Sequence, residues 1–569
     1  MRYQGTVAAR GIAAGKAFCY QPYTPSFSKD ALADNPALEL ETYKTAYQTA
    51  REELDVLAAH LSTNHPEQAE IFEAHKEILD DEVMDEEIIE ALESGEFTAS
   101  QAVDLVYSQY AEALRSSGNA LIAERAADMN DVKLRILRCI EGKEDKGLSS
   151  LREPVILIAK DLLPSDTALL DPELVLAIVT EEGGVTSHTA IIARSYGIAA
   201  LSGIENILEV IHENKNLIVD AINGTLTVDP TAEEMALYHT AHADFLKLLE
   251  DEHTYLSTEA FTSEHTRIQV LANIGAADAR ELECVPNVDG VGLFRTEFLY
   301  MGREELPNEE EQFQHYKRVL EAFSPRPVTL RTLDIGGDKE VACLNLPKEE
   351  NPFLGNRALR FCLMHEEIFL TQLRAALRAS VYGNLKIMFP MVASIDDIDK
   401  AKAVLRKAQA QLTAEGIAWN PNVKIGVMIE IPALAAIADL VAQEVDFASI
   451  GTNDLTQYTL AVDRVNPDVA NYYQGLHPAI MRLLNFTIRA FNEAGKDISV
   501  CGEMGGDPLA AAALLGMGTR CLSMGYSSVP TIKKLICNLD MEKARHTEKE
   551  VCTLKTAEEV KQVLEQLLA

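Results

Sequence analysis

A histidine at position 188 follows two glycines, where a strand-like segment gives way to a helix-like one. Gly183 and Gly184 precede Thr186, Ser187 and His188. Glycines let backbone N–H groups face an anion, Thr186 or Ser187 can cap the helix, and a helix N-terminus attracts phosphate. A histidine ring nitrogen can also hold a phosphoryl group covalently. His188 is therefore a candidate phosphate-carrying nucleophile, and a capped helix with a buried, hydrogen-bonded histidine is the structural alternative.

Five charged side chains at or just beyond the ends of strand-like segments form a second candidate site. Guanidinium groups bind phosphate and carboxylate oxygens, and two carboxylates on neighbouring strands can share one Mg²⁺. Opposite charges at one place therefore predict a small polyanion bridged by a metal ion. A surface salt bridge is the alternative for any one arginine taken alone. The five residues are Arg295, Arg331, Arg464, Glu430 and Asp454.

Cys501 ends another strand-like segment, so we expect its thiol at the same site, where it could act as a general acid.

The chain has nine cysteines and no Cys-x-x-Cys pair, which indicates neither a disulfide framework nor a zinc ribbon. It also lacks a Gly-x4-Gly-Lys-[Ser/Thr] loop and a Gly-x-Gly-x-x-Gly fingerprint after a strand. A nucleotide is therefore not the obvious phosphoryl donor.

The elements that would position the second site are eight short apolar segments that alternate with helical ones after residue 265. Eight strand-then-helix units predict a (βα)8 TIM-type barrel. The polar residues named above fall at the C-terminal ends of these segments, which is the face where barrel active sites are built. The predicted strands are 268–274, 290–295, 328–333, 385–390, 424–429, 447–450, 498–501 and 521–524.

The first 260 residues predict a different architecture. Two β-type pieces, 3–8 and 16–20, precede more than a hundred residues of helical periodicity, and strand-like segments return after Gly147. The early strands have no other sheet nearby, so we expect a multidomain α/β protein in which a helical bundle is inserted into an α/β domain. The expected divisions are an α/β domain (1–34 and 144–230), the inserted bundle (35–143), a helical linker (231–260) and the barrel (261–569).

Composition limits the class of protein. The 569 residues are 47% hydrophobic and carry a net charge of −37, with a pI near 4.7, which disfavours binding to nucleic acid or to an anionic membrane. No apolar stretch is long enough to span a membrane and the N-terminus lacks a signal peptide, so we expect a cytoplasmic protein. Residues 66–96 hold thirteen acidic residues and one basic residue. This stretch could be a solvated helix face or a docking surface for a basic partner.

Several longer motifs closely resemble those of the phosphoenolpyruvate-protein phosphotransferases, the enzyme I family of the bacterial sugar phosphotransferase system. The resemblance runs essentially from end to end, and the motifs are specific together rather than singly. Besides the segment around His188, they are 161–167, 292–297, 331–339, 351–355, 430–432, 449–454, 463–466 and 501–504.

The resemblance implies that His188 takes the phosphoryl group of phosphoenolpyruvate, releasing pyruvate, and passes it to a histidine of the carrier protein HPr. It implies that the α/β domain is the phosphohistidine domain, that the helical insertion docks HPr and that the barrel binds phosphoenolpyruvate and forms a homodimer. The implied roles are phosphate binding by Arg295 and Arg331, binding of the other substrate oxygens by Asn453 and Arg464, Mg²⁺ binding by Glu430 and Asp454, protonation of carbon 3 by Cys501, and orientation of the His188 ring by Thr167.

Four positions depart from the family pattern. Ala9 and Arg10 stand where the family usually has Ser-Pro, Asn356 where it has Trp, and Gly505 where it has Ala. None removes a group with an implied role. Asn356 lies beside Arg357, so we expect at most an effect on substrate affinity.

Two other readings stay open. One is a dikinase-type relative such as phosphoenolpyruvate synthase, although residues 1–145 are too short and too helical for the ATP-binding domain that it needs. The other is a non-catalytic sensor of phosphoenolpyruvate, although every group needed for turnover is present.

Because His188 and the barrel belong to different domains, we also predict a swivel about residue 145 and about 230–258.

Overall fold

The computed structural model describes most of the chain. The described residues are 1–20, 23–28, 33, 35–64, 66–116, 120–143, 148, 151–162, 166, 170–183, 188–275, 281–301, 303, 305–336, 342–344, 349–464 and 466–568. The chain divides into two compact units, Met1–Phe245 and Leu246–Ala569. Among the described residues no helix is both long enough and apolar enough to cross a membrane.

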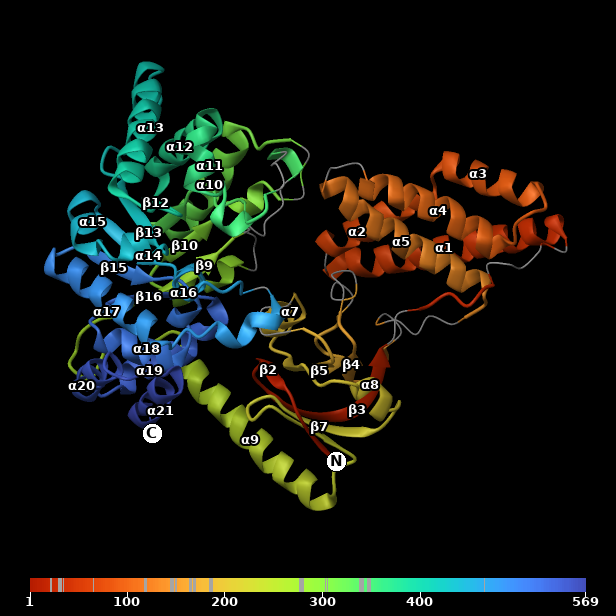
Figure 1. The fold of residues 1–569 in the computed structure, drawn as a ribbon, viewed down its shortest axis with the longest axis horizontal. Helices are drawn as coiled ribbons and strands as arrows, with labels where there is room; N and C mark the ends of the chain where they lie inside the picture. The colour runs from red at the N-terminus through yellow and green to blue at the C-terminus, as the bar shows by residue number, and fades with distance from the viewer. Residues whose placement is uncertain are drawn as a thin grey trace. The chain divides into compact units, whose positions relative to one another are not determined.

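The first unit contains an eight-stranded mixed sheet (Figure 1). The predicted pairing of the N-terminal strands with the later ones is confirmed, because β3 lies parallel to β4 and antiparallel to β7. In sheet order the strands are β1 (Arg2–Gln4), β8 (Thr225–Val228), β7 (Asn216–Asp220), β3 (Ile12–Tyr20), β4 (Val155–Ala159), β5 (Val175–Thr180), β6 (Ala199–Ser202) and β2 (Thr6–Ala9).

The prediction of a single strand over 3–8 is wrong, because the chain changes sheet edge at Gly5. β1 pairs with β8 and β2 pairs with β6, which lie toward opposite ends of the sheet order. Consecutive Cα atoms are about 3.8 Å apart, so the sheet must curl until its two edges meet at this residue. A Cβ on Gly5 would lie 2.8 Å from the Ile204 side chain, which explains why a glycine makes the step.

Among the described residues between β3 and β4, five helices form the inserted bundle. Its core is apolar and includes Leu54, Ile88, Val103 and Ile136, which are fully buried. The helices of this unit are α1 (Pro36–Asn64), α2 (Pro66–Leu79), α3 (Glu82–Glu93), α4 (Ala99–Ser116), α5 (Ala120–Ile140), α7 (His188–Tyr196) and α8 (Ile207–Val210). Helix α9 (Ala232–Thr254) follows, within the predicted linker, and the division between the two units falls inside it.

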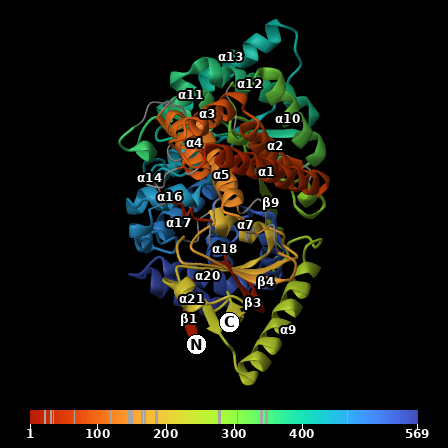
Figure 2. The ribbon, with the colours of Figure 1, turned by 90° about the vertical axis from the view of Figure 1, so that its right-hand side faces the viewer.

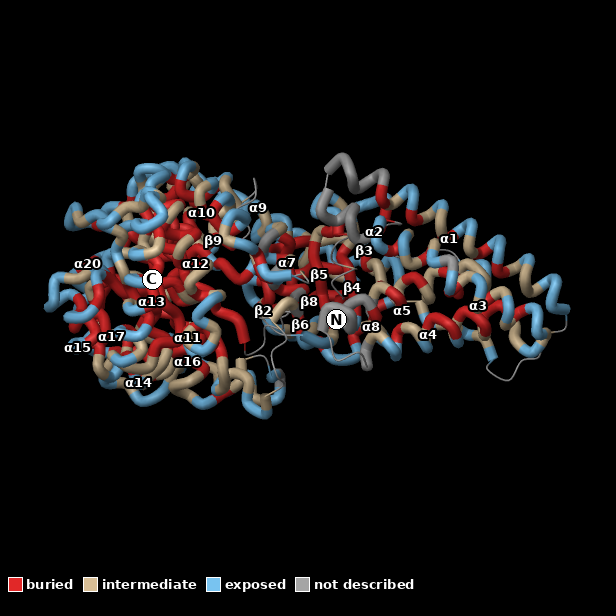
Figure 3. The backbone as a smooth tube through the Cα atoms, turned by 90° about the horizontal axis from the view of Figure 1, so that it is seen from above, coloured by how far each residue is buried: buried red, intermediate tan, exposed pale blue. Residues whose placement is uncertain are grey.

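The second unit confirms the predicted barrel. Eight parallel strands close on themselves in the order β10-β11-β12-β13-β14-β15-β16-β9. The strands are β9 (Gln269–Ile274), β10 (Val291–Arg295), β11 (Pro327–Arg331), β12 (Asn384–Phe389), β13 (Lys424–Ile429), β14 (Phe447–Ile450), β15 (Asp497–Val500) and β16 (Cys521–Met524). Their residues are mostly buried, as Figure 3 shows.

Helices surround the barrel, and α10, α12 and α13 lie side by side over one sector of it (Figure 2). Their apolar faces pack on the strands, with Phe369 of α12 and Phe389 of β12 in edge-to-face contact. The helices are α10 (Glu309–Phe323), α11 (Leu359–Met364), α12 (Glu366–Ala379), α13 (Ile395–Ala414), α14 (Pro432–Ala435), α15 (Ala438–Glu444), α16 (Thr452–Leu460), α17 (Pro478–Glu493), α18 (Pro508–Gly516), α19 (Val529–Asn538), α20 (Met541–Val551) and α21 (Ala557–Leu568).

Candidate active site at the barrel mouth

The predicted charged residues of the barrel follow the carboxyl ends of neighbouring strands. Arg295 and Arg331 are the last residues of β10 and β11, Glu430 directly follows β13, and Asp454 lies in the first turn of α16, just after β14. Parallel strands end at one face of a barrel, so these side chains share one mouth. The arrangement concentrates both signs of charge where a small ligand can enter.

Arg331 is buried and fixed by carboxylates. Its guanidinium lies 2.6 Å from Glu297 Oε1 and 2.9 Å from Asp334 Oδ2, and 6% of the residue is exposed. Burial lowers the pKa of Arg331, but Asp334 and Glu297 more than compensate and raise the pKa above its ordinary value. The arginine is therefore a permanent, oriented cation at the end of β11.

The structure adds a second buried arginine, Arg357, to the candidate site. In the sequence it stands out only as the neighbour of Asn356. Arg357 is 1% exposed. Its guanidinium lies 3.1 Å from Asp334 Oδ1 and 3.7 Å from Asp454 Oδ1. It also donates a hydrogen bond to the Tyr458 hydroxyl. It stands in a loop rather than at a strand end, so the strand pattern gives no signal for it. Its place after the 351–355 motif was the only clue in the sequence.

Backbone geometry makes room for Arg357. Gly336 has a φ of +103°, and a Cβ there would lie 2.6 Å from the Cβ of Arg357. Ala358, the next residue, adopts a φ of +50°, which is rare for a residue other than glycine. Both features place strained or close-packed backbone beside the buried guanidinium.

Glu430 and Asp454 lie close enough to interact electrostatically. Glu430 is 1% exposed, and its Oε1 accepts a hydrogen bond of 2.6 Å from the Met391 N–H. Burial raises the pKa of Glu430 above its ordinary range, and the nearby carboxylates of Asp454 and Asp334 raise it further. Gly451 lies against this carboxylate, because a Cβ there would come 2.9 Å from Oε2.

These two carboxylates fit a Mg²⁺ ion. Asp454 Oδ1 is buried and accepts no hydrogen bond from the residues that the structure describes, so an oxygen is left for a ligand. Within that described part no group of three or more potential ligands gathers in one place. Mg²⁺ is usually bound through one or two carboxylates, water and substrate phosphate, so two carboxylates suffice.

Cys501 directly follows β15 and is 4% exposed. Its Sγ lies 3.6 Å from the Ile450 carbonyl, and it packs with Leu293, Met388 and Met428 inside the barrel. Burial raises the pKa of the thiol to about 11, although Ser449 and Arg331 lower it in part. The thiol therefore keeps its proton at neutral pH.

The three remaining barrel residues border this cluster. Arg464 has its guanidinium 3.7 Å from Asp454 Oδ1, and Asn453 Oδ1 accepts a hydrogen bond of 3.0 Å from the Glu503 N–H. Arg295 is exposed, and its charge lowers the pKa of Cys501. Arg295 and Asn453 lie at or just beyond strand ends, as predicted, whereas Arg464 follows helix α16 instead of a strand and borders the site through Asp454.

His188 is the first residue of α7 in the other unit, as predicted for a residue at a helix N-terminus. Its side chain and the whole of Thr167 lie outside the described part of the chain. The next residue is held in place, because the buried Thr189 donates a hydrogen bond of 3.3 Å to Asp161 Oδ1. This contact joins the first turn of α7 to the 161–167 segment.

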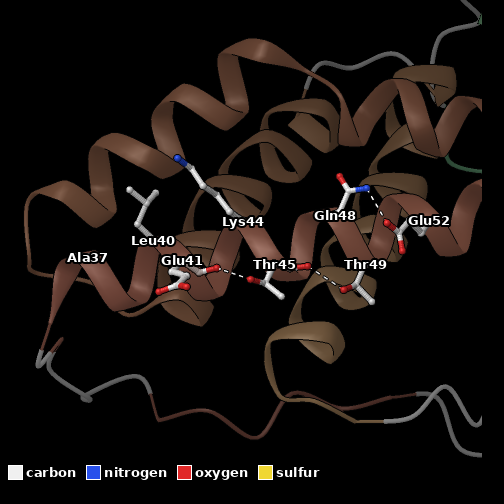
Figure 4. Close-up of a pocket in the computed structure, with 8 residues that line it drawn as sticks. All are labelled: Ala37, Leu40, Glu41, Lys44, Thr45, Gln48, Thr49 and Glu52. Atoms are coloured by element: carbon white, nitrogen blue, oxygen red, sulfur yellow. Dashed lines mark hydrogen bonds between the residues drawn. The ribbon is translucent and has the colours of Figure 1, made fainter.

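A hollow of about 620 Å³ lies along α1, and none of the residues discussed above lines it (Figure 4). Its polar side chains bond along their own helix: Gln48 donates to Glu52, Thr45 to the Glu41 carbonyl, and Thr49 to the Thr45 carbonyl. No set of polar groups converges on a common point there. The hollow is therefore not the predicted active site.

Three family models match the chain in succession. They are described as PEP-utilising enzyme, N-terminal (residues 4–125), PEP-utilising enzyme, mobile domain (151–224), and PEP-utilising enzyme, PEP-binding domain (250–541). The last model covers the barrel and the candidate site.

Full-length relatives give the same result. The phosphoenolpyruvate-protein phosphotransferase of Priestia megaterium is 42% identical over 98% of this chain and 97% of its own length. That of Bacillus subtilis (strain 168) is 41% identical over 98% of each chain. An NMR structure of an Enzyme I protein is 33% identical and covers 43% of this chain and 99% of its own, with a TM-score of 0.39. With such relatives along almost its entire length, the chain belongs to the phosphoenolpyruvate-protein phosphotransferase family.

Proposed function

We propose that this protein transfers the phosphoryl group of phosphoenolpyruvate to His188 and then to a histidine of HPr, the first step of the sugar phosphotransferase system. The observation that carries the proposal is the group of buried, mutually fixed charges at the barrel mouth. Arg331 and Arg357 share Asp334, and Arg357 and Arg464 both face Asp454. Phosphoryl transfer depends mainly on charge stabilisation and positioning, which such a cluster supplies.

In this proposal Arg295 and Arg331 hold the phosphate of phosphoenolpyruvate, and Asn453 and Arg464 hold its remaining oxygens. The carboxylates around Arg331 fix the direction of its guanidinium before substrate arrives. A group that is already oriented loses little entropy when it binds, so it favours the transition state. Arg357 would add a further positive charge at the same mouth.

Glu430 and Asp454 are the proposed ligands of Mg²⁺. When bound, the ion neutralises negative charge on the phosphate and carboxylate oxygens of the substrate. The two carboxylates would otherwise repel one another, because the charge of Asp454 adds to burial in raising the pKa of Glu430.

The proposed first transfer breaks the bond between phosphorus and the enol oxygen and forms a bond from phosphorus to a His188 ring nitrogen. The enolate that remains accepts a proton at carbon 3 from the Cys501 thiol, which gives pyruvate, and the thiolate regains its proton from water. A thiol with a pKa of about 11 is protonated at neutral pH, as a general acid must be. Thr167 would orient the His188 ring.

The remaining parts of the proposal concern the rest of the chain. The α/β domain (1–34 and 144–230) would carry His188, the helical insertion (35–143) would dock HPr, and the linker (231–260) would join them to the barrel (261–569). The barrel would form the homodimer, and the protein would act in the cytoplasm. The many acidic residues in 66–96 suit a basic carrier protein.

The test is incubation with Mg²⁺ and phosphoenolpyruvate labelled in its phosphate, comparing the wild type with His188→Ala, followed by addition of HPr. We expect acid-labile, base-stable label in the wild type alone, which then moves to HPr. Label on the His188→Ala variant would exclude His188 as the acceptor. Absence of label in the wild type would reject phosphoenolpyruvate as the donor. Incubation with labelled ATP would then test whether the protein is a dikinase-type enzyme.

A further inference from the structure

Gln372 lies on α12, behind the barrel mouth, and is 1% exposed. Apolar neighbours on the same helix, including Phe369, Leu373 and Ala376, are fully buried. A primary amide in such surroundings is costly unless each of its polar atoms is hydrogen-bonded. Its partners therefore indicate why a polar residue stands there.

The amide of Gln372 bonds to three separate segments. Its Oε1 accepts a hydrogen bond of 2.9 Å from the Leu333 N–H, and its Nε2 donates to Thr296 Oγ1 at 3.0 Å and to the Tyr316 hydroxyl at 3.2 Å. A backbone N–H can only donate, so the amide oxygen must face Leu333 and the NH₂ group must face Thr296 and Tyr316. The orientation of the amide is thus fixed by its partners.

Two of these partners lie in the loops that directly follow the proposed phosphate-binding arginines. Thr296 follows Arg295 and precedes Glu297, and its hydroxyl donates a hydrogen bond of 2.9 Å to the Arg331 carbonyl. Leu333 lies between Arg331 and Asp334. The Gln372 amide therefore joins the end of β10 to the end of β11, within two residues of four charged members of the site.

The same contact explains where β11 ends. We expected this strand to continue to Leu333, but it ends at Arg331. The N–H of Leu333 donates to a side chain of α12 instead of to a neighbouring strand. From Arg331 to Leu333 the chain is held by the Thr296 hydroxyl, the Met388 carbonyl and the Gln372 amide.

We propose that Gln372 is a positioning residue for phosphoenolpyruvate, which sets the separation of Arg295 and Arg331 through Thr296 and Leu333. This role rests on the proposed function of the barrel mouth. Gln372 does not touch substrate in this account. It acts because two arginines must meet one phosphate, so a small shift of either loop weakens both contacts.

A matched control lies in the same buried network. Gln312 of α10 is also 1% exposed, accepts hydrogen bonds from Tyr300 and Tyr316, and donates to the Pro307 carbonyl. Two of these partners, Tyr300 and Pro307, lie in the loop after β10, but none of the three lies within two residues of a charged member of the site. Gln372→Met and Gln312→Met each remove a buried amide from its hydrogen bonds, so both should lower the thermal midpoint of the barrel.

The first experiment compares these two variants with the wild type by steady-state kinetics with phosphoenolpyruvate. Gln372→Met should lower kcat/KM about 10- to 100-fold, mainly through KM, whereas Gln312→Met should leave kcat/KM unchanged. Gln372→Glu keeps an acceptor for Leu333, but its second oxygen would face the Thr296 and Tyr316 hydroxyls, which already donate elsewhere, so it should lower kcat/KM at least as far as Gln372→Met. Equal kinetic losses in the two methionine variants would overturn the inference.

A double-mutant cycle tests the route through Thr296. Thr296→Val should lower kcat/KM by itself, and adding Gln372→Met to it should cost less than the sum of the two effects, because both break the same connection. Strictly additive effects would show that Gln372 acts independently of Thr296 and would contradict the proposal.

Hydrogen exchange without substrate separates this inference from the proposed function. Gln372→Met should speed exchange in 331–334 relative to both the wild type and Gln312→Met. Unchanged exchange there overturns the inference even if phosphoenolpyruvate is the substrate. If phosphoenolpyruvate does not label the wild type, only the proposed function is overturned. The exchange result then still decides whether Gln372 fixes the two loops. If Gln372→Met does not fold, Thr296→Val, which breaks the same connection from the other side, provides the comparison.

Discussion

At the scale of the residue, the site contains a thiol whose environment suits one task. Cys501 is buried beside Arg331 and the Ile450 carbonyl, and burial raises its pKa to about 11. A nucleophilic cysteine would need the opposite shift, because the thiolate is the reactive form. The environment of Cys501 therefore favours a proton donor over a nucleophile.

Replacement of Cys501 by Ala should lower the rate of pyruvate formation by about 10²- to 10⁴-fold, the usual contribution of a general acid. The loss follows because the enolate then takes its proton from solvent. Pyruvate release in single turnovers, with deuterium incorporation at carbon 3, measures the step directly. Cys284→Ala, at a buried cysteine that bonds the Glu281 carbonyl, is the matched control. Similar rates for both variants would remove Cys501 from the mechanism.

We expect His315 to make barrel stability depend on pH. Its ring stacks on Phe294 with centroids 5.5 Å apart, and its Nε2 is buried without a partner among the described residues. Burial lowers the pKa of His315, and the charge of Arg318 lowers it further. The folded protein therefore resists protonation of this ring more than the unfolded chain does.

The sign of the effect follows from that difference. Below the ordinary histidine pKa of about 6.5, the unfolded chain binds a proton that the folded state refuses, so stability falls as the pH falls. His315→Phe should reduce the drop in thermal midpoint between about pH 7.5 and pH 5.5. His546→Phe, at an exposed position of α20, is the control. An unchanged drop in the His315→Phe variant would contradict the assignment.

At the scale of the element, helix α19 holds the C-terminal end of α9. Thr531 donates to the buried Glu252 carboxylate at 2.7 Å, and Lys534 pairs with Asp251 at 2.7 Å. Lys533, 5% exposed, donates hydrogen bonds of 2.7 Å to the carbonyls of Leu256 and Asn287. These contacts fix the last turn of α9 to the barrel, so any bending of the linker must occur before Asp251.

Lys533→Met should destabilise the barrel by about 1–3 kcal/mol, because two carbonyl groups lose a charged donor in a buried place. The adjacent Lys534→Met is the matched control, since it removes only a partly exposed salt bridge worth about 0–1 kcal/mol. Thermal unfolding measures the destabilisation. Hydrogen exchange at 252–258 should rise in the first variant alone. Equal losses in the two variants would show that the Lys533 contacts add nothing specific.

The sequence predicts elements well where one local pattern decides them. The eight barrel strands follow from short apolar runs with polar residues at their ends, and the polar ends identify the functional face. The split at Gly5 was missed because it depends on strands two hundred residues away. Arg357 and Gln372 were also missed as functional residues, since a loop arginine and a buried helix glutamine gain their roles only from long-range contacts.

At the scale of the whole molecule, α9 connects two units that must cooperate. His188 belongs to the first unit and the arginines of the barrel mouth to the second. In the proposed function a phosphoryl group can reach HPr only if His188 meets the two partners in turn. The proposed function therefore predicts that the linker allows at least two arrangements of the units.

Cross-linking the units in a single arrangement should abolish one half-reaction and spare the other. Labelling by phosphoenolpyruvate reports the first half-reaction, and transfer of label to HPr from protein phosphorylated before cross-linking reports the second. Cross-links confined within one unit are the control and should spare both. If both half-reactions survive in a species proven to be cross-linked between units, the swivel is wrong.

The measurement that tests the central claim most directly is identification of the phosphorylated atom. The wild type is incubated with Mg²⁺ and phosphoenolpyruvate, and ³¹P NMR and peptide mapping at alkaline pH locate the phosphoryl group. The account predicts a single phosphoramidate on the ring of His188, formed with one equivalent of pyruvate and lost when HPr is added. A phosphoryl group on any other residue, or pyruvate formation without a phosphorylated protein, would contradict it.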